Sequence, residues 1–316
     1  MNAETHTMAS SLDICRPRAN EPLPATSLTF FAMPKAFCGH VGCIQRNAIE
    51  SWTRLQPRPQ VLLFGDDDGV AETAGELGLQ HTAAVGRNEY GTPLMDDMFR
   101  IAHQLATSRT LVYINSDIIL LEDFSQAIAR LDAAIPGPFL LIGRRTDVDV
   151  FDPLDFCCFD WPQRLSATVS RIGTLAPRVC KDYFVFRKPL FAEIPPFAIG
   201  RAAFDNWLVF HARQQGIPVI DGTRVIRAIH QNHDHRHVSG GRGHAYLKGE
   251  EAKRNCELAG GMRLIKGSTT TWVLTPRRLR RRLIPSDLLQ FGFDMPRFLL
   301  LVGELFGWRD EFQDPR

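Results

Sequence analysis

Two polar residues that follow a short apolar run are spaced to hold a divalent cation. The run Thr110–Ile114 (TLVYI) has the composition of a buried strand, and Asn115, Ser116 and Asp117 come directly after it. In an extended tripeptide, residues i and i+2 point the same way, so Asn115 and Asp117 are predicted to aim two oxygens into one crevice. Mg²⁺ or Mn²⁺ takes few carboxylates and completes its shell with phosphate oxygens and water. The alternative is an ordinary turn, where Asn and Asp are common.

A second acidic group, Asp66-Asp67-Asp68, follows the apolar run Gln60–Phe64 and leads into a helical segment. One interpretation is that Asp66 hydrogen-bonds a nucleobase or ribose. The other is that these carboxylates only cap the next helix and interact with its dipole.

Histidines gather late in the chain. Five lie within 15 residues: His230, His233, His235, His237 and His244. A structural zinc site normally closes with four ligands, often cysteines, and the nearest cysteine is Cys256. We therefore weigh three interpretations: structural zinc, one histidine that completes a divalent site, and a solvated polar loop. The glycines of this segment favour a mobile loop over 230–246.

Asp205 is the candidate general base. It lies in Phe204-Asp205-Asn206-Trp207, where a helix is expected to begin, and the aromatic neighbours offer apolar surface. The alternative is that this carboxylate only interacts with the helix dipole.

The elements that must position these residues alternate along the chain. Apolar runs predict strands over 27–33, 60–64, 80–85, 110–114, 139–143, 183–186, 219–220 and 225–229. Helical spacing predicts helices over 40–55, 70–79, 161–172, 202–214 and 250–258, one that ends near 134, and one opened by Thr92 as N-cap with Pro93 at its first position. This order predicts an α/β fold with a mostly parallel sheet covered by helices on both faces.

Composition excludes several classes. Of 316 residues, 44% are apolar and 23% charged, as in globular proteins, and 37 basic against 35 acidic residues argue against a nucleic-acid binder. No apolar run reaches the roughly 18–20 residues of a membrane span. Seven cysteines without a paired spacing favour reduced thiols, and the first residues lack an apolar leader core, so a cytoplasmic protein is expected.

Three regions are predicted: a loose tail over 1–25, one domain over 26–262, and a basic and then apolar C-terminal extension over 263–316. The extension either lies on an anionic membrane surface or packs as a helix with a solvated basic face.

The sequence resembles nucleotide-diphospho-sugar glycosyltransferases of the GT-A fold, closest to a little-characterised bacterial and plant group. The stretches that carry the likeness are IQRNAIESW (Ile44–Trp52), LFGDDDGVAE (Leu63–Glu72), RNEYGTPL (Arg87–Leu94), YINSDIIL (Tyr113–Leu120), DYFVF (Asp182–Phe186), PPFAIGRAAFDNWL (Pro195–Leu208) and IHQNHDH (Ile229–His235). The resemblance implies a Rossmann-type, mostly parallel sheet with a C-terminal helical extension.

The same resemblance implies roles for single residues on the donor side. Asp66 matches the carboxylate that contacts the nucleotide base, and Asn115 a ribose or water-bridged contact. Arg87, Tyr90 and Thr92 lie in the segment that lines the nucleotide pocket.

For the reaction centre, the resemblance implies Asp117 as ligand of Mn²⁺ or Mg²⁺, with His230, or alternatively His233, completing the shell. Asp205 matches the base of inverting members. The implied donor is a nucleoside-diphosphate sugar, and the acceptor hydroxyl is not named. Two other functions remain open: a sugar-1-phosphate nucleotidylyltransferase, and a nucleotide-sugar-binding module without turnover.

Overall fold

The computed structural model describes residues 27–233, 249–261 and 270–282. The chain divides into two units, Met1–Arg280 and Arg281–Arg316, and the elements discussed below belong almost wholly to the first. The predicted N-terminal tail, most of the predicted mobile loop and the apolar part of the predicted C-terminal extension, from 283 onward, lie outside the described residues. No helix in the described ranges is long and apolar enough to cross a membrane.

A nine-stranded sheet forms the centre of the described chain. Its order is β13-β12-β10-β6-β9-β4-β1-β2-β3. The bounds are β1 Leu28–Ala32, β2 Gln60–Phe64, β3 Gln80–Thr82, β4 Thr110–Ile114, β6 Leu140–Ile142, β9 Tyr183–Arg187, β10 Val219–Asp221, β12 Trp272–Leu274 and β13 Leu279–Arg281. Strand β9 runs antiparallel to β4 and β6, whereas β1, β2, β3 and β4 pair in parallel, as do β6, β10 and β12. The predicted mostly parallel α/β sheet is confirmed.

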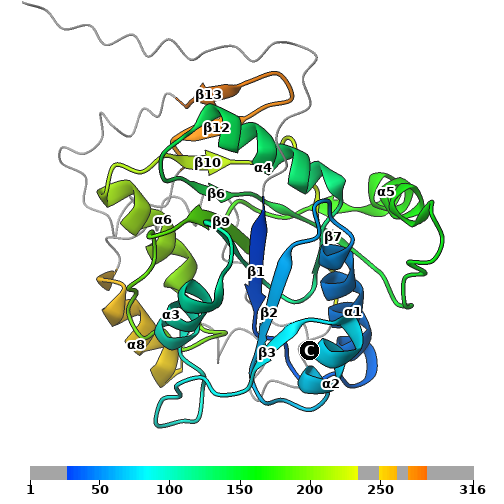
Figure 1. Ribbon diagram of the computed structural model, residues 1–316. Coiled ribbons are helices and arrows are strands. Elements are labelled where there is room, and N and C mark those ends of the chain that lie inside the picture. The colour runs from blue at the N-terminus through cyan, green and yellow to red at the C-terminus, as the bar shows by residue number, and fades with distance from the viewer. Residues whose placement is uncertain (1–26, 234–248, 262–269, 283–316) are drawn as a thin grey trace, which may run out of the picture. The chain divides into compact units, whose positions relative to one another are not determined.

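Helices cover both faces of this sheet. The bounds are α1 Gly39–Thr53, α2 Val70–Leu77, α3 Met95–Leu105, α4 Glu122–Ala134, α5 Trp161–Ile172, α6 Phe204–Gln214 and α8 Glu250–Leu258. Side chains of α1, α2 and α4 share one buried core, and those of α3 and α6 share the other. Figure 1 shows α1 and α2 on the opposite side of β1 and β2 from α3.

The alternation of a strand explains the two cores. Adjacent residues of β1 point to opposite faces, so Phe30 stacks on Trp52 of α1 while Phe31 meets Phe99 of α3 edge-on. Every residue of β1 is buried, as expected for a strand covered on both sides.

A second, four-stranded sheet carries the polar residues of interest. Its order is β5-β11-β7-β8, with β5 Ile118–Ile119, β11 Ala228–Gln231, β7 Arg145–Val148 and β8 Thr174–Leu175. Strand β11 lies between β5 and β7, antiparallel to the first and parallel to the second. Because β5 begins directly after Asp117, this sheet brings the end of β4 beside β11.

Three local predictions are corrected. Helix α3 begins at Met95 with Leu94 as N-cap, so Thr92 does not cap it and Pro93 is not its first residue. The strand expected over 225–229 begins only at Ala228, since Val225 and Ile226 hydrogen-bond back to Gly222 in a turn.

Two segments have a different secondary structure from the one expected. His230, expected in a loop, is instead buried within β11. In the segment predicted as a helical extension, the described residues form strands β12 and β13.

Candidate metal centre and active site

The segment Asn115–Asp117 is a turn. The backbone N–H of Ile118 donates to the carbonyl of Asn115 at 3.2 Å, which closes the turn between β4 and β5. The extended tripeptide expected here is therefore wrong, and the two side chains take different partners. The amide of Asn115 donates to Oδ1 of Asp182 at 2.8 Å, whereas Asp117 faces the histidines of β11.

Asp117, His230 and His233 form one cluster. Nε2 of His233 lies 3.2 Å from Oδ2 of Asp117, and Nε2 of His230 lies 3.5 Å from the same oxygen. One ligand atom from each residue falls within 4.8 Å of the others. The other oxygen of Asp117, Oδ1, is buried and has no hydrogen-bond partner among the described residues. The structure thus brings together the three residues singled out as metal ligands.

The electrostatic surroundings keep Asp117 ionised. Burial raises the pKa of this carboxyl, but hydrogen bonds and the charges of His230 and His233 outweigh burial and hold the pKa well below its usual range. An ionised carboxylate with a free oxygen beside two imidazole nitrogens is a donor set for a divalent cation.

Further charged groups surround the cluster. Arg145 donates from Nε to Oδ1 of Asp147 at 2.8 Å and from Nη1 to Oδ1 of Asp182 at 2.9 Å. Burial raises the pKa of the Asp182 carboxyl, Asp117 adds to this rise, and Arg145 opposes it. With both histidines neutral, as metal ligands must be, and all three carboxylates ionised, Asp117, Asp147 and Asp182 against one guanidinium leave a net charge of −2, which a divalent cation would neutralise.

The donor atoms of this cluster can be compared with the preferences of the two expected ions. Two imidazoles and one carboxylate suit a first-row transition ion such as Mn²⁺ better than Mg²⁺, which prefers oxygen ligands. Three protein ligands would also leave positions open for phosphate oxygens and water. The residues therefore fit the expected metal.

Asp205 lies in the first turn of α6 and is 8% exposed. The ammonium of Lys181 lies 3.3 Å from its Oδ2 and also donates to Oδ1 of Asn206 and to the carbonyl of Val179. Because Lys181 directly precedes Asp182, one short segment before β9 contacts both Asp205 and the residues around the side-chain cluster of Asp117, His230 and His233.

Asp66 and Arg87 form an ion pair at the end of β2. The Asp66 side chain is 62% exposed, and Arg87 also donates to the carbonyl of Gly91. Tyr90 is 61% exposed, while Thr92 hydrogen-bonds the Glu251 carboxylate of α8. Asp66 and Arg87 thus lie together, and Thr92 is directed to α8 instead.

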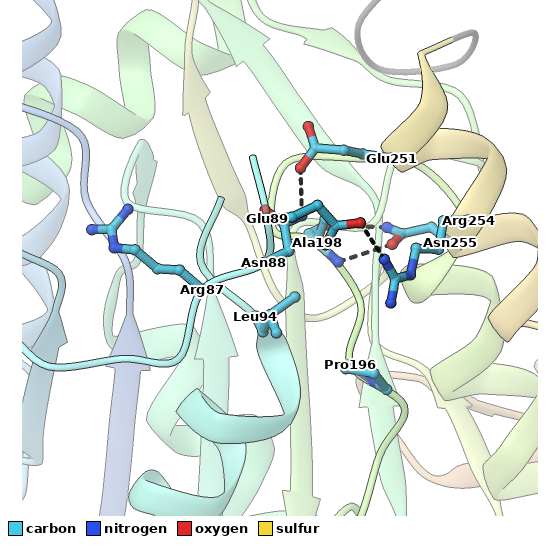
Figure 2. Close-up of a pocket in the computed structure, with 9 residues that line it drawn as sticks. All are labelled: Arg87, Asn88, Glu89, Leu94, Pro196, Ala198, Glu251, Arg254 and Asn255. Carbon is cyan, nitrogen blue, oxygen red and sulfur yellow. Dashed lines mark hydrogen bonds and ion pairs between the residues drawn. The ribbon is translucent and has the colours of Figure 1, made fainter. Parts of the chain in front are cut away.

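A cavity of about 320 Å³ lies between this segment and α8. Figure 2 shows Asn88 and Glu89 directed to Glu251 and Arg254 of α8, while Arg87 extends away from them. Leu94, Pro196 and Ala198 supply its apolar surface, and Asn255 fastens α8 to the backbone of Ala198.

Sequence reasoning missed Arg145 and Lys181. The alternation Arg145-x-Asp147 on a strand places both side chains on one face and is a signal that could have found the first. Lys181 precedes an apolar strand at the edge of the site, but nothing in its own spacing predicts a contact with α6.

The sequence matches no protein-family model and no curated protein. Solved structures do match. A mannosyltransferase of Pyrobaculum calidifontis, in complex with GDP-Man and Mn²⁺, is 14% identical over 68% of this chain and 60% of its own length, with a TM-score of 0.41. Glucosyl-3-phosphoglycerate synthase of Mycobacterium tuberculosis, with Mg²⁺ and UDP, is 12% identical over 84% of this chain and 92% of its own, with a TM-score of 0.44. Both are nucleotide-sugar glycosyltransferases, the class that the sequence resembles.

Proposed function

We propose that this chain is a metal-dependent glycosyltransferase that moves a sugar from a nucleoside-diphosphate sugar to an acceptor hydroxyl with inversion. The observation that carries the proposal is the cluster of Asp117, His230 and His233 at the end of β4. In open α/β sheets, ligands bind outside the carboxyl ends of the strands, where this cluster lies.

On the donor side, Asp117, His230 and His233 are the residues that would hold Mn²⁺ or Mg²⁺. A bound ion there supplies positive charge to the diphosphate, which makes it a better leaving group. Asp66 accepts a hydrogen bond from the base or ribose, and its ion pair with Arg87 fixes the carboxylate at the end of β2. Asn115, whose amide is held by Asp182, contributes by bracing the turn rather than by binding ribose.

On the acceptor side, Asp205 is the base. Its carboxylate accepts the proton of the acceptor hydroxyl while that oxygen bonds to the anomeric carbon and the bond from this carbon to the diphosphate breaks. Lys181 keeps the carboxylate in place by donating to Oδ2. A single displacement of this kind inverts the anomeric configuration.

A donor panel tests the proposal. UDP-, GDP- and ADP-sugars are incubated with the protein and Mn²⁺, and thermal stabilisation and sugar release are followed. One donor should stabilise the protein by about 2.7 kcal/mol when present with Mn²⁺ at 100 times its Kd, and clearly less when the metal is chelated. NMR of the product should show the inverted anomer. Stabilisation by no donor, or a retained configuration, would contradict the proposal, and stabilisation without sugar release would indicate a binding module.

A further inference from the structure

We propose that Asp147 is a positioning residue of the metal centre: its carboxylate holds one nitrogen of His230 so that the other nitrogen faces the cation. This inference rests on the proposed function, because it assigns a role around the same metal cluster.

The backbone register sets His230 between two carboxylates. In β11, His230 lies opposite Ile118 of β5, the residue after Asp117, and opposite Asp147 of β7. A three-stranded arrangement of this kind fixes the ring from both sides. His230 is 7% exposed, so the ring has little freedom to rotate away.

The two ring nitrogens of His230 face different groups. Nε2 lies 3.5 Å from Oδ2 of Asp117, on the metal side, and Nδ1 lies 2.9 Å from Oδ1 of Asp147. A neutral imidazole carries one proton, and a carboxylate beside Nδ1 keeps the proton there. Nε2 then has a free electron pair for a cation, as in the carboxylate–histidine–metal triads of many metalloproteins.

The contact between Nδ1 and Asp147 is close but not in line, and within the part of the chain that the structure describes Nδ1 makes no hydrogen bond of good geometry. Active-site hydrogen bonds are often poorly aligned before the ligand binds and tighten when it does. We expect Nδ1 and Oδ1 to come into line if Nε2 holds a cation.

Asp147 is itself held in place. Arg145 lies two residues earlier on the same face of β7 and donates from Nε to the same Oδ1 at 2.8 Å. Its guanidinium also bonds Asp182, and the Arg145 side chain is only 9% exposed. The carboxylate of Asp147 is thereby fixed toward β11 rather than toward solvent.

Calorimetric titration with Mn²⁺ alone, without nucleotide or acceptor, tests the role. Asp147→Ala should weaken Mn²⁺ binding by about 10- to 100-fold, the usual cost of losing such a partner. Co²⁺ provides a second readout, since its visible absorption bands should shift when His230 is no longer oriented. Asp149→Ala is the matched control: it removes an equal charge from the same segment, where Asp149 bonds only Asn232 among the contacts described. It should bind Mn²⁺ as the parent does.

Two further variants separate the possible failures. If His230→Ala binds Mn²⁺ like the parent, the proposed metal site itself is wrong. If His230→Ala loses affinity but Asp147→Ala stays within twofold of the parent, Asp147 has no positioning role and the inference is overturned. Should Asp147→Ala melt early in EDTA, Asp147→Leu, which also lacks an acceptor for Nδ1–H, replaces it, and an unchanged Mn²⁺ affinity and Co²⁺ spectrum in that variant also overturn the inference.

Discussion

The ammonium of Lys181 lies 3.3 Å from Oδ2 of Asp205, and the two side chains are only 6% and 12% exposed. This pair joins the segment before β9 to the first turn of α6. It gives the proposed base a fixed position and a countercharge. Asp205 therefore has a proposed role in the reaction, and the pair has a second role in the stability of the fold.

Asp205→Asn should abolish most turnover and spare binding. The amide cannot accept the acceptor's proton, so the transfer rate should fall by about 10²- to 10⁴-fold. Donor and Mn²⁺ affinity should stay unchanged in calorimetry. Asn206→Ala is the control, since it removes the other side-chain partner of Lys181 and leaves the carboxylate. Turnover by Asp205→Asn at near the parent rate would remove Asp205 from the mechanism.

Lys181→Met should destabilise the protein. It leaves the Asp205 carboxylate buried without a countercharge, and breaking a buried ion pair from one side typically costs about 3–5 kcal/mol. Urea unfolding measures the loss. The double variant Lys181→Met/Asp205→Asn should recover part of it because no uncompensated charge remains. Equal stability of parent and Lys181→Met would show that the pair contributes nothing to the fold.

His103 should make the protein sensitive to acid. Burial, with a smaller effect of the nearby Lys188, lowers its pKa from 6.5 to about 4. Below pH 6.5 the imidazole of His103 in the unfolded chain therefore takes up a proton. In the folded protein the same imidazole stays neutral until about pH 4. The free energy of unfolding should fall through this window, by up to about 3 kcal/mol.

The difference between parent and His103→Gln isolates this contribution. Urea unfolding from pH 7 to pH 4, with EDTA present, should give a flatter profile for the variant. Parallel profiles for the two proteins would mean that His103 titrates normally in the folded state.

Asp66→Ala should weaken nucleotide binding whether or not metal is present. A hydrogen bond to a charged group contributes about 1.5–3 kcal/mol, so a loss of roughly ten- to a hundredfold is expected. Asp68→Ala is the control, because its side chain is also exposed and lies two residues away. Fluorescence titration with a labelled nucleoside diphosphate measures both. Equal losses in the two variants would indicate a general charge effect rather than a contact by Asp66.

The elements of the first half were predictable because their signals are local. Strands β2 and β4 begin and end where the apolar runs do, and α1 differs from its prediction by one or two residues. Asp117 could also be found, since a carboxylate after a buried strand lies at the ligand-binding edge of such a sheet.

The surroundings of Asp117 were not predictable, because they depend on pairing between distant segments. His230 reads as the start of a polar loop, and only the register of β11 with β5 and β7 reveals it as a buried residue. Asn115 reads as a partner of Asp117, yet a turn directs its amide to Asp182, 67 positions later in the chain.

Metal-dependent donor binding through Asp117 is the central claim, and calorimetry of UDP, GDP and ADP tests it most directly. One of these nucleotides should bind at least tenfold more tightly with Mn²⁺ than with EDTA. Asp117→Asn should bind that nucleotide with the weak affinity in both conditions, because the amide replaces the free carboxylate oxygen. Equal affinity of the parent protein with Mn²⁺ and with EDTA, for all three nucleotides, would contradict the account.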